Sequence, residues 1–177
     1  MGATENSKFL SLILRHKPET IGLKLDPNGW VNVIELLTQM NKNGRQLNMS
    51  ELEYVVETNN KKRFEFNDDK TKIRASQGHS LGVDLQYESK TPPTILYHGT
   101  STTFVESIKA SGLLKLKRDH VHLSSDTDTA TKVGSRHGKP FIFEVLAGEM
   151  VENGFKFYQS TNGVWLTDHV PSKYLKY

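Results

Sequence analysis

Apolar residues recur with helical spacing near the start of the chain. Positions 9, 10, 13 and 14 are all apolar, which places them on one face of a helix. Asn6 or Ser7 can accept a backbone N–H as an N-cap, and Pro18 disfavours helical geometry at Lys17. The pattern therefore predicts a helix that begins at Asn6 or Ser7 and ends at Lys17.

The next segments alternate between short extended stretches and a second amphipathic helix. Residues 21–25 alternate in polarity as a short strand does, and residues 26–29 carry a strong turn signal with Pro and Gly. Apolar positions 33, 34, 36, 37 and 40 then recur with helical spacing. They predict a second helix, which Asn43-Gly44 ends.

A third helix and a charged hairpin complete the first half. The helix has apolar positions 52, 55 and 56; Asn48 or Ser50 is its N-cap, and Ser50 would place Glu53 in a capping box. Residues 61–66 and 72–75 alternate in polarity around a polar turn, which predicts two paired strands. Helices followed by such a hairpin indicate a small winged-helix domain.

Two prolines with polar neighbours interrupt the pattern at residues 88–93, and we place a domain boundary after residue 90. The segments 1–90 and 91–177 are therefore predicted to be separate lobes. The second lobe carries short, mostly strand-like runs, as expected of a mixed α/β unit. Its predicted strands are residues 95–98 (ended by Gly99), 120–123, 140–145 and 164–166, and its predicted helices are residues 104–110 (closed by Gly112) and 127–133.

Composition narrows the class of protein. The 177 residues are 36% hydrophobic and 24% charged, with a formal charge of +3, so the positive bias is mild and any anion site must be a local cluster. The absence of cysteine excludes disulfides, thiolate nucleophiles and Cys-type zinc sites. The sequence contains no signal-peptide pattern and no apolar run of membrane-spanning length. We therefore expect a cytoplasmic protein.

Arg15, His16 and Lys17 crowd the predicted last turn of the first helix. Such bases complement the negative end of a helix dipole, which is the plainer interpretation. Alternatively, a rigidly held arginine and histidine suit the grip of a phosphate. The spacing alone favours the dipole interpretation.

Familiar nucleotide and metal signatures are missing. The chain has no G-x-G-x-x-G fingerprint after a strand, no Walker P-loop and no H-E-x-x-H motif. His120 and His122 would share one strand face, but they have no acidic partner at ligand spacing. We therefore expect no metal.

Several short motifs remain, and each has a structural explanation when taken alone. Arg63 suits an edge-strand charge, Gln77-Gly78-His79-Ser80 a turn, His98 a core histidine and Arg118 a surface loop. Arg74 is interpreted as wing surface. The order of the motifs along the chain is more informative than any one of them.

As an ordered set, these motifs resemble those of the RNA 2′-phosphotransferase family (the KptA-type tRNA 2′-phosphotransferases). The resemblance extends over nearly the whole chain, from Ser7 to the C-terminus. The motifs that carry it are Leu14-Arg15-His16, Asp26-Pro27-Asn28-Gly29-Trp30, Lys62-Arg63-Phe64, Gln77-Gly78-His79-Ser80, His98-Gly99-Thr100, Val121-His122-Leu123-Ser124 and Gly163-Val164-Trp165-Leu166.

The resemblance implies an α+β protein with an N-terminal winged-helix lobe that binds RNA and a C-terminal lobe of the ADP-ribosyltransferase fold that binds NAD⁺. It also implies removal of an internal 2′-phosphate from RNA, of the tRNA splice-junction type, in two steps. The phosphate attacks NAD⁺ and expels nicotinamide, which gives a 2′-phospho-ADP-ribosyl RNA. The ribose 2″-hydroxyl then attacks that phosphate, leaving 2′-hydroxyl RNA and ADP-ribose 1″,2″-cyclic phosphate.

The same resemblance assigns roles to residues. It implies that the reaction is carried out by Arg15, His16, Arg63 and Arg118. It also places His98 in the NAD⁺ site, with His122 in the same signature. Further candidates for NAD⁺ contacts are Gly99, Thr100, Ser124 and Arg136, although Arg136 equally suits the cap of a helix. The expected partners are 2′-phosphorylated RNA and NAD⁺, with no membrane and a monomeric chain.

A missing carboxylate bears on the substrate. Many protein-modifying ADP-ribosyltransferases carry a late catalytic glutamate, whereas the matching region here is Gly163-Val164-Trp165. An apolar Val164 is tolerable when the substrate's own phosphate, with a second pKa of ~6, is the nucleophile. Two alternatives stay open: ADP-ribosylation of nucleic-acid terminal phosphates, and a non-catalytic RNA-binding module.

Overall fold

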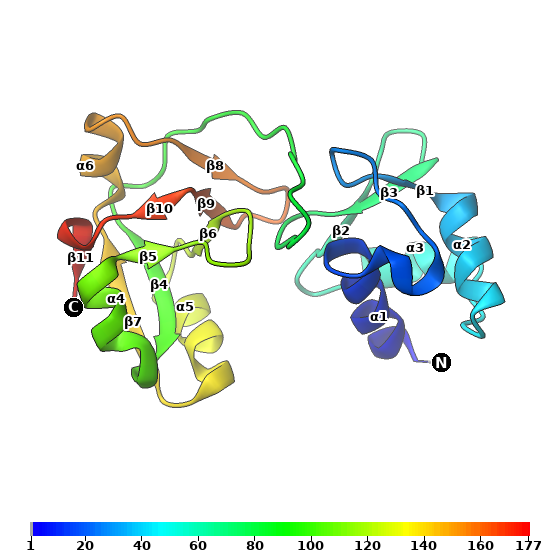
Figure 1. Ribbon diagram of the computed structural model, residues 1–177, viewed down its shortest axis with the longest axis horizontal. Coiled ribbons are helices and arrows are strands. Elements are labelled where there is room, and N and C mark those ends of the chain that lie inside the picture. The colour runs from blue at the N-terminus through cyan, green and yellow to red at the C-terminus, as the bar shows by residue number, and fades with distance from the viewer. Residues whose placement is uncertain (1) are drawn as a thin grey trace. The chain divides into compact units, whose positions relative to one another are not determined.

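The computed structural model describes residues 2–177, which form two compact units (Figure 1). The first unit extends to Gln86 and the second is Tyr87–Tyr177. The division thus falls before residue 90. The reason is local pairing: Ser89 forms a β-bridge with Tyr158, and the Lys90 N–H donates to the Phe157 carbonyl at 2.8 Å.

The described part of the first unit combines helices with one small sheet. Its elements are α1 (Ala3–Arg15), η1 (Pro18–Ile21), β1 (Val31–Asn32), α2 (Val33–Lys42), α3 (Met49–Glu57), β2 (Phe64–Phe66) and β3 (Lys72–Ala75). The sheet is antiparallel with strand order β1-β3-β2. The β2–β3 hairpin is the predicted one, although β2 begins only at Phe64.

Helix α1 begins earlier than predicted. Its first residue is Ala3 and its N-cap is Gly2, so neither Asn6 nor Ser7 caps it. Glu5 lies in the first turn, where a carboxylate interacts favourably with the helix dipole. The helix ends at Arg15, before Pro18. The hydroxyl of Ser7 is therefore available for a tertiary contact rather than for a cap.

Three other local predictions are corrected. Residues 21–25 form no strand, because the 3-10 turn η1 runs to Ile21 and Gly22 adopts a left-handed φ of 69°. Ile34 is 75% exposed and does not belong to the core face of α2. The cap of α3 is Asn48, which forms a capping box with Glu51.

The core of the first unit lies where its helices meet the sheet. Leu10, Ile13 and Leu14 of α1 are fully buried, as helical spacing predicts. They belong to one apolar cluster with residues of the other elements. Among its members are Leu36, Met40, Leu52, Phe64 and Ile73.

The second unit is built from short antiparallel sheets with helices beside them (Figure 1). Its elements are β4 (Leu96–Ser101), η2 (Thr102–Phe104), α4 (Val105–Ser111), β5 (Leu113–Leu114), β6 (Val121–Leu123), α5 (Thr127–Gly134), η3 (Ser135–His137), β7 (Pro140–Val145), α6 (Ala147–Glu152), β8 (Phe157–Gln159), β9 (Trp165–Thr167), β10 (His169–Val170), η4 (Ser172–Tyr174) and β11 (Leu175–Lys176). The strand orders are β11-β7-β4, β6-β9-β8 and β10-β5. Both units are thus of mixed α+β character.

Strand β4 continues through Gly99, where the sequence predicts its end. It pairs with β7 from Leu96, opposite Val145, to Ser101, opposite Pro140. A Cβ at Gly99 would collide with the carbonyl of Ala130 in α5. This glycine therefore allows a helix to pack on the strand at backbone distance instead of ending the strand.

Candidate functional site

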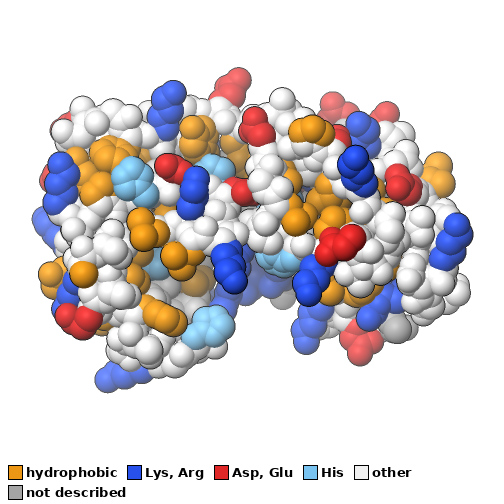
Figure 2. Space-filling model, in the orientation of Figure 1, with side chains coloured by type: hydrophobic (Ala, Val, Ile, Leu, Met, Phe, Trp, Pro, Cys, Tyr) orange, Lys and Arg blue, Asp and Glu red, His pale blue; other side chains and the backbone are white. Residues whose placement is uncertain are grey.

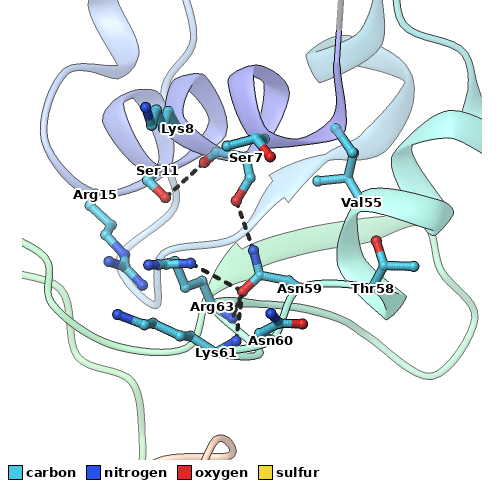
Figure 3. A pocket seen from close by; sticks show the side chains of 12 residues that line it. Ser7, Lys8, Ser11, Arg15, Val55, Thr58, Asn59, Asn60, Lys61 and Arg63 are labelled. Atoms are coloured by element: carbon cyan, nitrogen blue, oxygen red, sulfur yellow. Dashed lines mark hydrogen bonds between the residues drawn. The ribbon is translucent and has the colours of Figure 1, made fainter. Parts of the chain in front are cut away.

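A pocket of about 500 Å³ lies within the first unit, between α1 and the segment that leads into β2 (Figure 3). The α1 wall carries Ser7, Lys8, Ser11 and Arg15. The opposite wall carries Thr58, Asn59, Asn60, Lys61 and Arg63. Arg15 and Arg63, which lie 48 positions apart in the sequence, thus line one cavity.

The end of α1 holds the first pair of predicted site residues. The Arg15 carbonyl accepts a hydrogen bond from the Ser80 backbone N–H at 3.0 Å. The Nδ1 atom of His16 lies 2.9 Å from the hydroxyl oxygen of Ser80. A hydrogen bond to one imidazole nitrogen restricts the orientation of the His16 ring. Ser80, whose motif taken alone indicates a turn, is therefore a direct hydrogen-bonding partner of Arg15 and His16.

His79 lies beside this pair and is almost completely buried, with 1% of its surface exposed. Within residues 2–177, neither of its ring nitrogens has a hydrogen-bond partner. Burial, followed by the positive charges of Arg15 and Arg74, lowers the pKa of His79 from 6.5 to about 4. The ring is therefore neutral at physiological pH, and it places no further positive charge behind Arg15 and His16.

The turn at residues 26–29 packs against His79. Gly29 has a φ of 83°, and a Cβ there would lie 3.2 Å from the His79 Nε2 atom and 3.0 Å from the Val83 Cγ1 atom. Gly29 therefore meets two requirements, a left-handed conformation and a close approach. The motifs at residues 26–30 and 77–80, which are separated in the sequence, therefore pack against each other.

The interpretation of Arg74 as a surface residue of the wing is wrong. It is 9% exposed, and its Nε atom lies 2.6 Å from the Glu65 carboxylate. The guanidinium also lies 4.4 Å from the centre of the Trp30 ring and donates to the Leu85 carbonyl at 3.2 Å. Arg74 therefore ties the hairpin to the turn before β1, and its partners mark it as structural.

Arg63 precedes β2 and is half-buried. Its backbone N–H donates to the Asn59 side-chain oxygen at 3.2 Å, and its Nη1 atom donates to the same oxygen at 3.4 Å. The guanidinium lies near that of Arg15, which reaches the pocket from the opposite wall (Figure 3). Two forked cationic donors in one cavity suit an anion such as a phosphate.

In the second unit, the predicted NAD⁺ contacts gather where β4 meets β6. The Nδ1 atom of His98 lies 3.1 Å from the His122 carbonyl oxygen. Burial lowers the pKa of His98, and the hydrogen bond to His122 partly offsets this effect. Tyr97 and Ser124 exchange two backbone hydrogen bonds of 2.8 Å. His98, His122 and Ser124 are thus brought together by strand pairing, which the sequence order does not reveal.

The remaining predicted residues of this unit fall into two groups. Thr100 lies in β4 next to Gly99 and is 9% exposed, while Gly99 has the packing role described above. Arg118 and Arg136 are exposed, the first in the loop before β6 and the second in η3. The Arg118 N–H donates to the Lys115 carbonyl at 3.0 Å, which folds its loop into a turn.

Figure 2 shows both acidic and basic side chains on the visible face of each unit, so neither presents a uniformly basic surface there. This fits the small net charge of +3. Among the described residues, no three His, Asp or Glu side chains gather in a way that would hold a metal ion. Nor does any helix within residues 2–177 have the length and apolar character needed to cross a membrane.

Comparisons with known proteins agree on a family. The family model described as "RNA 2′-phosphotransferase, Tpt1 / KptA family" matches residues 2–169. A "Probable RNA 2′-phosphotransferase" of Flavobacterium johnsoniae is 58% identical over 171 residues, covering 97% of this chain and 94% of the relative. Proteins with the same description from Fusobacterium nucleatum and Trichormus variabilis are 55% and 56% identical, each covering 96% of this chain and 96% and 93% of the relatives, respectively. The chain belongs to the RNA 2′-phosphotransferase, Tpt1 / KptA family.

Proposed function

We propose that this protein is an NAD⁺-dependent RNA 2′-phosphotransferase that removes an internal 2′-phosphate from RNA. The observation that carries the proposal is the cavity of the first unit, where Arg15 and Arg63 line the same space within a family member. Planar guanidinium groups bind phosphate oxygens in pairs and hold them in a fixed orientation. The first unit therefore serves as the phosphate-binding and RNA-binding part.

The substrate phosphate needs orientation more than activation. Its second pKa is ~6, so it is largely dianionic at neutral pH and is already a nucleophile. Arg15 and Arg63 hold it in place, and positioning of this kind accounts for a large share of the rate in such reactions. No general base is required for this step, which agrees with the apolar Val164 just before β9.

The second unit carries groups that fit NAD⁺. His98, with a lowered pKa, is a neutral hydrogen-bonding group, and the hydroxyls of Thr100 and Ser124 suit ribose oxygens. The guanidinium of Arg136 suits a phosphate. When bound, NAD⁺ supplies the ADP-ribose group that the RNA phosphate accepts, with loss of nicotinamide.

Release of the phosphate from RNA completes the reaction. The RNA carrying the phospho-ADP-ribosyl group is attacked at phosphorus by the ribose 2″-hydroxyl, and the RNA 2′-oxygen leaves. We assign Arg118, with Arg15 and Arg63, to the negative charge that develops on the phosphate oxygens. To His16, whose Nδ1 atom lies 2.9 Å from the Ser80 hydroxyl oxygen, we assign donation of a hydrogen bond or a proton. The products are 2′-hydroxyl RNA and ADP-ribose 1″,2″-cyclic phosphate.

The decisive experiment incubates the purified protein with a short RNA that carries one internal 2′-phosphate, with and without NAD⁺. Mass analysis is expected to show NAD⁺-dependent loss of the phosphate together with nicotinamide and ADP-ribose cyclic phosphate. Intact RNA and intact NAD⁺ would contradict the proposal and point to a binding module. Stable ADP-ribosylated ends from 5′- or 3′-phosphorylated RNA, without turnover of the 2′-phosphate, would indicate terminal modification instead.

A further inference from the structure

The side chain of Asn59 joins the two walls of the first-unit pocket (Figure 3). Its Nδ2 atom donates to the Ser7 hydroxyl of α1 at 2.7 Å. Its Oδ1 atom accepts from the backbone N–H groups of Lys61 and Arg63, both at 3.2 Å, and from Arg63 Nη1 at 3.4 Å. One amide thus contacts the helix that ends in Arg15, the backbone of Arg63 and the guanidinium of Arg63.

The chain around Asn59 is folded tightly toward the pocket. The Asn59 carbonyl accepts from the Lys62 N–H at 2.8 Å, and Lys62 has a left-handed φ of 40°. On the other side, the Ser76 hydroxyl donates to the Lys62 carbonyl at 3.0 Å, and the Ser76 N–H donates to the Arg63 carbonyl at 2.9 Å. The backbone that carries Arg63 is therefore fixed from both sides.

We propose that Asn59 is a positioning residue for the reaction, one that aims the Arg63 guanidinium at the substrate phosphate. This inference rests on the proposed function. Asn59 need not touch the phosphate: it acts through the direction of the Arg63 side chain and through the spacing of the two pocket walls. Because arginine loses much of its advantage when its fork is not aligned, the effect falls on phosphate binding and orientation.

The chemistry of the amide explains why asparagine suits this position. Its oxygen is a neutral acceptor, so it orients the guanidinium without cancelling the positive charge of Arg63. An aspartate in the same place would form a charge-assisted bond with Arg63 and compete with the phosphate for it. It would also lose the donor that now reaches Ser7. Asn59→Asp keeps the shape of the side chain and changes its charge and its donor. It therefore tests whether the amide orients Arg63 or only fills the space.

A matched asparagine lies elsewhere in the first unit. Asn41 is half-buried like Asn59 and uses both ends of its amide: Nδ2 donates to the Leu37 and Leu47 carbonyls, and Oδ1 accepts from the Leu47 N–H. It stabilises the end of α2 and does not line the pocket. Asn41→Ala therefore reports what loss of such bonds does to stability and activity without any change at the pocket.

The test measures steady-state kinetics of the 177-residue chain on the 2′-phosphorylated RNA with NAD⁺. For Asn59→Asp we expect a melting temperature near that of the parent and a KM for RNA raised about tenfold or more. For Asn59→Ala we expect kcat/KM to fall by a similar factor. For Asn41→Ala we expect a lower melting temperature with kcat/KM unchanged at a temperature where the protein is folded.

A double variant decides whether Asn59 acts through Arg63. If it does, Asn59→Ala in an Arg63→Ala background lowers kcat/KM no further than Arg63→Ala alone, since the two changes remove one function. Additive losses would overturn the inference, as would unchanged kinetics of Asn59→Asp. An inactive parent protein would instead contradict the proposed function.

Discussion

Arg63 reaches the pocket with its backbone and its guanidinium bonded to one amide oxygen, so its fork has a defined direction. Arg63→Lys keeps the charge and removes the fork. We expect kcat/KM on 2′-phosphorylated RNA to fall between about tenfold and a hundredfold, because a lost charge-assisted hydrogen bond costs about 1.5–3 kcal/mol. Arg45→Lys is the control, since the Arg45 guanidinium lies over the Phe9 ring at 3.8 Å rather than in the pocket. Equal activity of Arg63→Lys and the parent would remove Arg63 from the site.

Buried His79 gives the first unit a specific sensitivity to acid. Its pKa is about 4 in the folded protein and 6.5 in the unfolded chain, so the unfolded chain takes up the proton first as pH falls. The stability associated with neutral His79 is complete above about pH 6.5 and is lost progressively toward pH 4. The whole effect is about 3 kcal/mol.

We expect His79→Phe to flatten the pH dependence of the unfolding free energy between pH 6.5 and 4, measured by urea denaturation. Some slope remains, because the pKa of His98 is lowered too. His137→Phe serves as the control, since His137 is exposed in η3. A slope that His79→Phe leaves unchanged would show that His79 does not titrate in this way.

At the scale of elements, the contact of α5 with β4 depends on Gly99. A Cβ there would overlap the backbone carbonyl of Ala130, which cannot rotate away as a side chain can. Gly99→Ala is therefore expected to destabilise the protein by about 3 kcal/mol or more, measured by chemical denaturation. Gly148→Ala in α6 is the control: its Cβ would meet the Thr94 methyl group at 3.2 Å, which small movements relieve. A cost for Gly99→Ala no larger than that for Gly148→Ala would contradict the packing account.

Elements with a clear period were predictable, and tertiary partners were not. Strand β7 and the end of α4 at Gly112 follow directly from apolar runs and a terminal glycine. The start of α1 was missed because Gly2 supplies no side-chain cap to recognise. Ile34 was misplaced because helical spacing defines a face but not its width.

The same contrast holds for the site. The motifs identified Arg15, His16 and Arg63 as a set, but a sequence does not display the bond from Asn59 to Ser7, which lie 52 positions apart. Arg74 was assigned to the surface because a charge in a hairpin is usually solvated. Its charge partner Glu65 lies directly opposite in β2, whereas the Trp30 ring that packs on the guanidinium comes from outside the hairpin.

At the scale of the whole molecule, charge is nearly balanced, and RNA binding must rest on few contacts. Four basic residues line the first-unit pocket: Lys8, Arg15, Lys61 and Arg63. Single-stranded RNA whose phosphates contact four basic side chains gives a slope of log K against log salt of about −3. We expect a slope no steeper than this in titrations of 2′-phosphorylated RNA. A much steeper slope would indicate an extended basic surface outside the pocket.

The pocket wall begins almost at the first described residues, since Ala3 and Thr4 line it together with the rest of α1. An affinity tag fused ahead of Ala3 would therefore emerge directly beside the cavity, where a histidine-rich tail can bind or screen anions. Removal of the first eight residues would take away Ser7 and, with it, the acceptor for Asn59.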